Sequence, residues 1–127
     1  MVPLAANELY RSGIALYDQG RFFEAHEVLE DLWRPTRGEE RLFLQSLIHF
    51  AVAFHHHGRG NRAGAERQLR KGLRKLAGYR PAYGGLDTER IYRGGQAALE
   101  QIGLGLPPEV PQLAPTFFRR RGGAALS

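Results

Sequence analysis

The chain of 127 residues contains no cysteine, which excludes disulfide bonds and metal sites built from thiolates. An intracellular location fits this composition, so we expect a cytoplasmic protein. Glu8 and Arg11 come too early in the sequence for an N-terminal signal peptide. The longest apolar run, residues 47–54, is interrupted by His49 and is far too short to cross a bilayer. We therefore expect a soluble protein with no membrane partner.

Lysine is also scarce, since the chain uses it twice against sixteen arginines. The formal net charge is +5, and the charges are unevenly distributed. Residues 1–31 contain six acidic residues and two arginines, whereas residues 59–80 contain eight basic residues and one acid. A length of 127 residues corresponds to one ordinary domain with its own hydrophobic core. The sequence thus describes a single basic domain with an acidic first quarter.

Five helices are predicted, and no segment resembles a strand. Their ranges are residues 4–19, 21 or 22 to 33 or 34, 36–57, 61–77 and 87–102. Gly20 and Pro35 end the first two helices, because glycine favours a helix C-cap and proline disfavours helical backbone before it. We expect Thr36 to cap the third helix with Glu39 as its reciprocal partner. Asp87 is the expected cap of the fifth helix, which has a weak point at residues 94–95.

A faint internal repeat has a period of 40 residues. Three residues of the first half recur in the second; the pairs are Gly20 and Gly60, Ala25 and Ala65, and Leu29 and Leu69. The pattern resembles the helical hairpin of tetratricopeptide repeats, whose usual period is about 34 residues. We therefore predict an all-α, single-domain antiparallel bundle over residues 1–102. Residues 103–127 form a tail rich in proline and glycine, with Phe117 and Phe118 as an anchor.

The third predicted helix is apolar around almost its whole circumference, so we expect it at the centre of the bundle. Its polar side chains form one narrow stripe: Gln45, His49 and His56. On the second helix, His26 and Glu30 lie one turn apart along an edge of the apolar face, beside Trp33. Glu24 lies on the opposite edge and Glu27 on the polar side. Because buried polar groups need partners, we predict an interior cluster in which the stripe faces His26 and Glu30.

The second helix identifies a family. The stretch from Phe23 to Trp33, followed by Leu44-Gln45-Ser46-Leu47-Ile48 and later by His56 and Gly60-Asn61, resembles domain-of-unknown-function family 309. The resemblance covers roughly residues 5–80, and its most specific part is the Glu-x-His-Glu-x-x-Glu-x-x-Trp block. The resemblance implies a compact helical fold. Members of the family are small proteins of bacteria and archaea. The resemblance implies no activity, because the role of the family is unassigned.

The segment His26-Glu27-x-x-Glu30 is similar to the zinc-protease helix motif with its second histidine replaced. Two ligands four residues apart share a helix face, and His56 or His49 can complete a site. Such a donor set suits zinc, manganese or iron. In a small metal-dependent hydrolase, His26, Glu30 and His56 would hold the ion and Glu27 would act as the base. Metal-free acid–base catalysis by a histidine between carboxylates is a further possibility.

The competing interpretation is a binding or structural module, and the sequence favours it. The His/Glu cluster is then a hydrogen-bonded seam or a metal site, and the bundle or its tail pairs with a second copy or another protein. Trp33 is expected to be a core anchor. A basic face on helix 61–77 is a weaker candidate for nucleic-acid binding, because no aromatic residues interleave with the charges. The sequence alone leaves open whether the chain is an enzyme.

Overall fold

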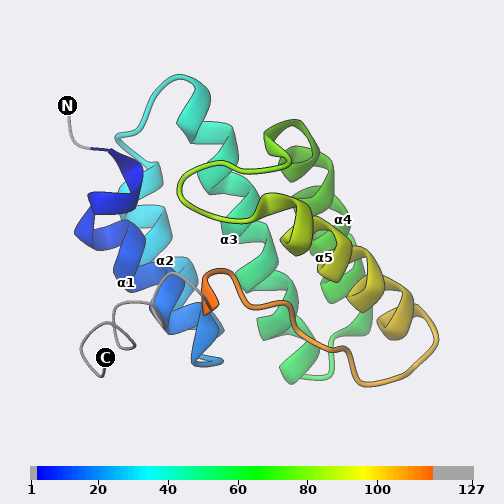
Figure 1. The fold of residues 1–127 in the computed structure, drawn as a ribbon. Coiled ribbons are helices and arrows are strands. Elements are labelled where there is room, and N and C mark those ends of the chain that lie inside the picture. Colours follow the sequence, from blue (N-terminus) through cyan, green and yellow to red (C-terminus); the bar gives the residue numbers. More distant parts are fainter. Residues whose placement is uncertain (1–2, 116–127) are drawn as a thin grey trace, which may run out of the picture.

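A computed structural model of the protein describes residues 3–115, which form five α-helices and no strand (Figure 1). The helices are α1 (Glu8–Asp18), α2 (Phe22–Trp33), α3 (Glu39–Gly58), α4 (Arg62–Leu76) and α5 (Thr88–Gly103). Short 3-10 turns, Leu4–Ala6 and Ala77–Tyr79, precede α1 and follow α4. The predicted all-α bundle is confirmed, and each helix lies close to its predicted range.

The first four helices form two hairpins, α1 with α2 and α3 with α4, that are closed by equivalent turns. Gly20 and Gly60 both have positive φ angles, +81° and +76°, which glycine adopts without steric cost. A backbone hydrogen bond from Arg21 to Leu16 closes the first turn at 2.9 Å, and one from Asn61 to His56 closes the second at 2.8 Å. The 40-residue repeat therefore has a structural counterpart at the two turns.

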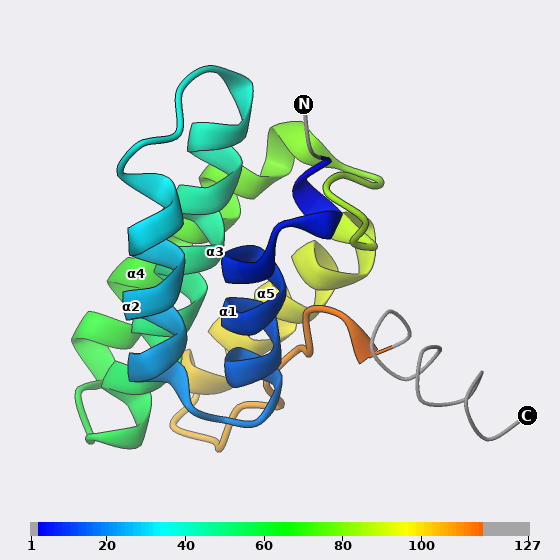
Figure 2. The same cartoon turned by 90° about the vertical axis from the view of Figure 1, so that its left-hand side faces the viewer.

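Helix α3 is central, as predicted, because it packs against both α2 and α4 (Figures 1 and 2). Phe43, Leu47 and Phe50 are completely buried along it. The helix is not buried on every side, however, since Leu42 is 45% exposed. In Figure 2, α2 and α4 lie to the left of the molecule and α1 and α5 to the right. The exposed side of α3 therefore faces outward between α2 and α4.

The first helix begins later than the sequence predicted. Asn7 has extended backbone geometry, with ψ of 130°, and separates the 3-10 turn from α1. Its side-chain oxygen accepts a hydrogen bond from the Tyr10 N–H at 3.0 Å, which satisfies a free donor of the first turn. The expected single helix from residue 4 is therefore wrong in its first turn, because an effective N-cap residue interrupts it.

Thr36 is not the cap of α3. Its hydroxyl donates a 2.6 Å hydrogen bond to the Leu32 carbonyl and so completes the C-terminus of α2. Helix α3 starts at Glu39 after Gly38, whose φ is +77° and whose lack of a side chain leaves the helix without a capping hydrogen bond. Asp87 is the cap of α5, as predicted, because its carboxylate accepts from the Arg90 N–H at 3.0 Å.

The segment after α5, residues 104–115, is called the strap here. It crosses the bundle from the end of α5 to the end of α1 and is drawn in yellow to orange in Figure 1. Its last part is buried, with Leu113 and Ala114 in the hydrophobic core. Helix α5 is continuous through residues 94–95, where a weak point was predicted. The predicted anchor, Phe117 and Phe118, lies outside the described residues.

None of the helices in the described part of the chain, residues 3–115, combines the length and the apolar character that crossing a bilayer requires.

Candidate functional site

The polar residues of α2 lie at the surface of the bundle. His26 Nε2 is 3.4 Å from Glu30 Oε1, and the two side chains are 21% and 31% exposed. Glu30 also accepts a long 3.4 Å hydrogen bond from Arg34. Glu24 is about half exposed and pairs with Arg21. The predicted pairing of His26 with Glu30 is confirmed, but the cluster is not inside the bundle.

The motif residues of α2 line a single surface hollow of about 460 Å³. Its lining comprises Leu16, Glu24, His26, Glu27, Val28, Glu30, Asp31 and Arg34. Glu27 is fully on the exposed side of the helix, as predicted. Four of the residues singled out from the sequence are therefore brought together, but at an open surface where water reaches the carboxylates.

In the polar stripe of α3, His49 contacts α4 and not α2. The Nδ1–H of His49 donates a 2.8 Å hydrogen bond to Gln68 of α4, and Nε2 of His49 is buried without a partner. Burial lowers the pKa of His49, and the nearby charges of Lys75, Lys71 and Arg74 lower it further, while the Gln68 hydrogen bond acts in the opposite direction. The predicted contact of His49 with the second helix is wrong, because α4 supplies the partner.

The two ends of α3 on this side contact different neighbours, namely α2 near Arg41 and the α3–α4 turn near His56. On the α2 side, the Arg41 guanidinium lies 4.0 Å from the centroid of the Trp33 ring. Half-buried Trp33 is therefore a packing surface at the edge of the core, and its Nε1 is buried without a partner. His56 contacts Asn61 at 3.3 Å, at the α3–α4 turn. Gln45 is half buried in the stripe.

These side chains define the α2–α3–α4 face. Its residues are Phe23, His26, Glu27, Glu30 and Trp33 of α2, Arg41, Leu42, Gln45, His49, Val52 and His56 of α3, and Gln68, Lys71, Arg74 and Lys75 of α4. Helical spacing places the α3 members on one side of that helix, because residues three, four and seven apart share a face. The face therefore spans three neighbouring helices.

The two edges of this face have opposite charges. In the described chain, Lys71, Arg74 and Lys75 form no ion pair, since Glu66 pairs with Arg62 and Arg70 instead. Burial lowers the pKa of Lys75, and the adjacent Arg74 and Lys71 lower it further. The other edge carries two of the acids of α2. Lys71, Arg74 and Lys75 are close neighbours on α4, and like charges this close on a helix repel. Helix α4 thus presents three cations without an ion-pair partner within the described residues.

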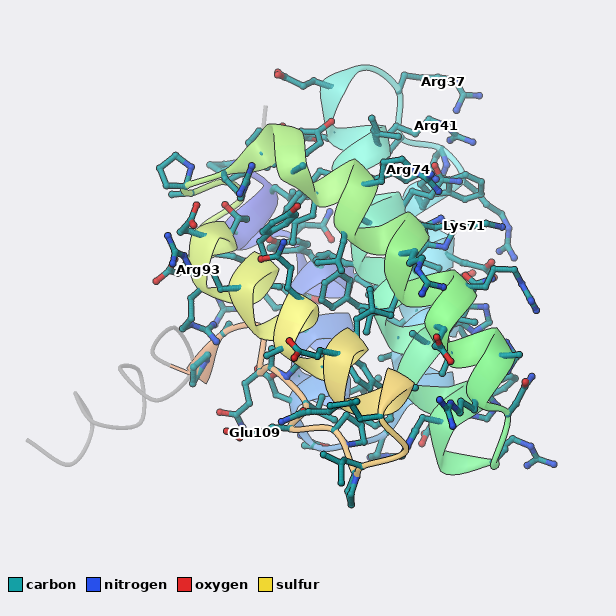
Figure 3. The ribbon with its side chains drawn as sticks, turned by 90° about the vertical axis from the view of Figure 1, so that its right-hand side faces the viewer. Arg37, Arg41, Lys71, Arg74, Arg93 and Glu109 are labelled. Atoms are coloured by element: carbon teal, nitrogen blue, oxygen red, sulfur yellow. The ribbon has the colours of Figure 1, made fainter. Side chains whose placement is uncertain are left out.

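Arg41 of the face and the neighbouring Arg37 have a structural role. Figure 3 shows Arg37 and Arg41 on the same side of the molecule as Lys71 and Arg74. The Arg41 guanidinium donates to the Trp33 carbonyl at 2.9 Å. The Arg37 guanidinium donates to the Arg34 carbonyl, directly after α2, at 3.0 Å. Cations at a helix C-terminus satisfy its free carbonyls and its dipole. The guanidinium groups of Arg37 and Arg41 are therefore already hydrogen-bonded to carbonyls at the end of α2. The cations of α4 on this face have no such partner among the hydrogen bonds and ion pairs of the described residues.

The predicted metal ligands are not assembled. Over residues 3–115, no three His, Asp or Glu side chains are arranged so that they hold one metal ion. His26 and Glu30 supply two possible donors, and His56 belongs to the α3–α4 turn instead. Glu27, the predicted base, is exposed beside the pair. A metal site here needs donors beyond this trio, and metal binding stays a prediction.

Sequence reasoning missed Asp18. Its two carboxylate oxygens accept the N–H of Leu113 at 2.6 Å and the N–H of Ala114 at 3.0 Å. Arg90 of α5 donates to the Leu113 carbonyl at 3.2 Å. Burial raises the pKa of Asp18, while the two N–H groups and the charge of Arg90 lower it. A lone acid at a helix end gives no sequence signal for such a contact, because its partners lie in an irregular segment far along the chain.

Comparison with known proteins is consistent with the resemblance found in the sequence. Residues 10–68 match the family described as Domain of unknown function (DUF309). This stretch runs from α1 into α4 and includes the motif of α2. The predicted resemblance is therefore confirmed over these residues, and the match brings no activity with it.

Two relatives are uncharacterised proteins. The chain is 38% identical over 85 residues to the uncharacterized protein YpuF of Bacillus subtilis (strain 168). The matched residues cover 64% of this chain and 48% of the relative. The chain is 28% identical over 108 residues to an uncharacterized protein of Aquifex aeolicus (strain VF5), covering 81% of this chain and 31% of the relative. The matched region thus spans about half or less of these relatives.

Proposed function

We propose that this protein is a non-catalytic assembly module that pairs with a second copy through the α2–α3–α4 face. The observation behind the proposal is the opposite charge of the two edges of that face. The acids lie on α2 and the unpaired cations on α4, with α3 between them. A cytoplasmic location, expected from the absence of cysteine, is part of the same proposal.

The charge arrangement selects one orientation for the pair. A two-fold axis parallel to α3 and lying in the contact plane places α2 of one copy opposite α4 of the other. Glu27 and Glu30 then approach Lys71 twice, once on each side of the axis, as an isologous interface requires. A two-fold axis perpendicular to α3 in the same plane would oppose α2 to α2 and create repulsion. The two α3 helices are therefore expected to run parallel.

The middle of the face supports a protein contact. Leu42 is exposed, Val52 and Trp33 are half buried, and a buried nitrogen of His49 has no partner. A helix of 20 residues is about 30 Å long, and three helices roughly 9 Å apart give a face of roughly 600 Å². Stable complexes bury about 800 Å² per partner, so this face is of the right order.

Nucleic acid fits the face less well than protein does. A phosphate backbone would meet favourable charges along Lys71 and Arg74, but it would also pass close to the acids Glu27 and Glu30. No exposed aromatic ring lies among the cations of α4, so base stacking has no platform there. A partner with both charge signs on its surface matches both edges, and a second copy is such a partner.

Sedimentation equilibrium over a range of protein concentrations tests the proposal. The wild type is expected to form dimers that weaken as salt is raised, since the edge charges are solvent-accessible. Glu27→Lys and Lys71→Glu should each weaken the dimer, and the double variant Glu27→Lys/Lys71→Glu should restore it by exchanging the two charges. Glu100→Lys on exposed α5 is the matched control and should change nothing. A wild type that stays monomeric at all concentrations would contradict the proposal.

A further inference from the structure

Most arginine side chains between residues 3 and 115 donate hydrogen bonds to a carboxylate or to a backbone carbonyl. The exceptions in this range are Arg59, Arg67 and Arg74, and all three are exposed. Arg67 and Arg74 both belong to α4, and their separation of seven residues places them on the same side of the helix. The unused arginine donors of the described chain are therefore concentrated on α4.

Two further cations extend this pair into a row. The row is called the α4 ridge here and consists of Arg67, Arg70, Lys71 and Arg74. Its four side chains line one surface hollow of about 420 Å³, together with Ala63 and Glu66. Lys71 forms no ion pair within the described residues, and Arg70 reaches the Glu66 carboxylate only at 3.5 Å. Figure 3 shows Lys71 and Arg74 on the side of α4 that is away from α5. The ridge is thus an open row of cations with few partners of its own.

The one acid in the hollow does not neutralise the ridge. The Glu66 carboxylate lies 3.3 Å from Arg62 and 3.5 Å from Arg70, so its single charge is shared between two arginines. Residues 62–75 contain six basic residues and only this acid. Like charges three or four residues apart on a helix repel, which keeps the side chains of the ridge apart. An elongated anion therefore matches the ridge better than a compact one, because it meets several separated cations at once.

We propose that the α4 ridge is a binding site for a condensed phosphate, an anion in which several phosphate groups are joined in a row. The planar guanidinium group of arginine pairs with two phosphate oxygens at once, and the ammonium group of Lys71 adds a point charge. Arg67 and Arg74 are about 10 Å apart along the helix axis, so a short chain of phosphates reaches all four cations. Arg67 and Arg70 are outside the α2–α3–α4 face, and the proposal does not depend on the dimer.

The lining of the hollow favours this anion over larger acidic partners. Ala63 is the only apolar residue among the described residues that line it, so an acidic protein segment would gain little hydrophobic contact beside its charges. None of these lining residues is aromatic, so a nucleotide base finds no ring on which to stack. The ridge therefore recognises phosphate groups alone, and a nucleoside triphosphate should bind no more tightly than the free phosphate chain does.

Isothermal titration calorimetry of the full chain with sodium tripolyphosphate at low salt tests the site. The wild type should bind inorganic phosphate at least about tenfold more weakly than tripolyphosphate, because linked phosphates engage several cations together. Arg67→Ala/Arg70→Ala should weaken tripolyphosphate binding about tenfold, since two exposed charge pairs are lost. Arg59→Ala/Arg93→Ala is the matched control, because it removes the same net charge from exposed positions outside α4 and should leave the affinity unchanged.

Several results would overturn the proposal. The first is a wild type that does not bind tripolyphosphate. The second is an equal loss of affinity in the two double variants, since net charge alone would then attract the anion. Adenosine triphosphate or a short DNA duplex that binds more than about tenfold more tightly than tripolyphosphate would assign the ridge to nucleotides or nucleic acid instead. Neither double variant changes the α2–α3–α4 face, so sedimentation of both variants reports on the proposed dimer separately.

Discussion

The carboxylate of Asp18 accepts the backbone N–H groups of both Leu113 and Ala114, which joins the last residue of α1 to the end of the strap across 95 residues of sequence. Near the start of the same helix, the Tyr10 hydroxyl donates a 2.6 Å hydrogen bond to the Gly84 carbonyl, in the loop before α5. Helix α1 is therefore fixed at both ends by later segments of the chain.

Replacing Asp18 by asparagine should loosen the strap. The amide has one acceptor oxygen for two N–H donors, so one backbone group loses its partner, and we expect the free energy of unfolding to fall by about 1–2 kcal/mol. Urea denaturation measures this loss. Asp31→Asn is the control, because it removes only an exposed pair with Arg34 and should cost less than about 0.5 kcal/mol. Equal stability of the two variants would show that the contact contributes nothing.

At Gly72, α4 lies close against α3. A Cβ atom there would lie 2.7 Å from the Phe50 ring and 3.2 Å from the His49 Cβ, so Gly72→Ala should destabilise the fold by about 1–3 kcal/mol. Gly58→Ala is the matched control, since no atom lies within 4 Å of a Cβ at that helix-end position. Gly58→Ala should leave the free energy of unfolding unchanged or raise it by at most about 1 kcal/mol. Thermal unfolding of both variants provides the measurement.

The stability of the protein should fall in mild acid because of His49. Its pKa is lowered in the folded state by burial and by the cations of α4, whereas the unfolded value is near 6.5. The unfolded state therefore binds more protons, and the stabilisation present above pH 6.5 is lost as the pH falls toward the folded pKa. Urea denaturation at pH 7.5 and pH 5 should show this loss, and His49→Gln should reduce it. An unchanged pH dependence in His49→Gln would remove His49 as the cause.

Metal binding by the α2 pair has a direct test. Elemental mass spectrometry of protein purified without a histidine tag measures bound zinc, manganese or iron. Because His26 and Glu30 supply only two donors, we expect metal well below one ion per chain, unaffected by His26→Ala. Stoichiometric metal that disappears in Glu30→Ala or His56→Ala would instead revive the hydrolase hypothesis, and Glu27→Gln would then test the base.

Much of the fold follows from the sequence, because local signals dominate it. Gly20 and Gly60 mark the hairpin turns, and the apolar pattern around Phe50 predicts a central helix. The boundaries that failed depend on competition between neighbours. Thr36 can cap either the helix behind it or the helix ahead of it, and only the packed chain decides between the two. Asn7 was overlooked because the apolar pattern continues across it.

The candidate site was predicted less well, for a physical reason. Spacing within α2 places His26 beside Glu30 correctly, since residues four apart share a helix face. Which helix faces His49 depends on how α3 is rotated between α2 and α4, and the pattern of one helix does not contain that information. The contact of Asp18 with the strap is further from prediction still, because its partners are backbone groups that every residue has.

The burial of Leu113 and Ala114 also orders events during protein synthesis. Helix α1 is translated before the strap, so the carboxylate at its end has no backbone partner until residue 114 has been translated and released. The apolar surface that Leu113 and Ala114 cover therefore stays uncovered until then. A nascent chain stalled before residue 113 would present that surface to chaperones, whereas a chain that includes the strap covers it.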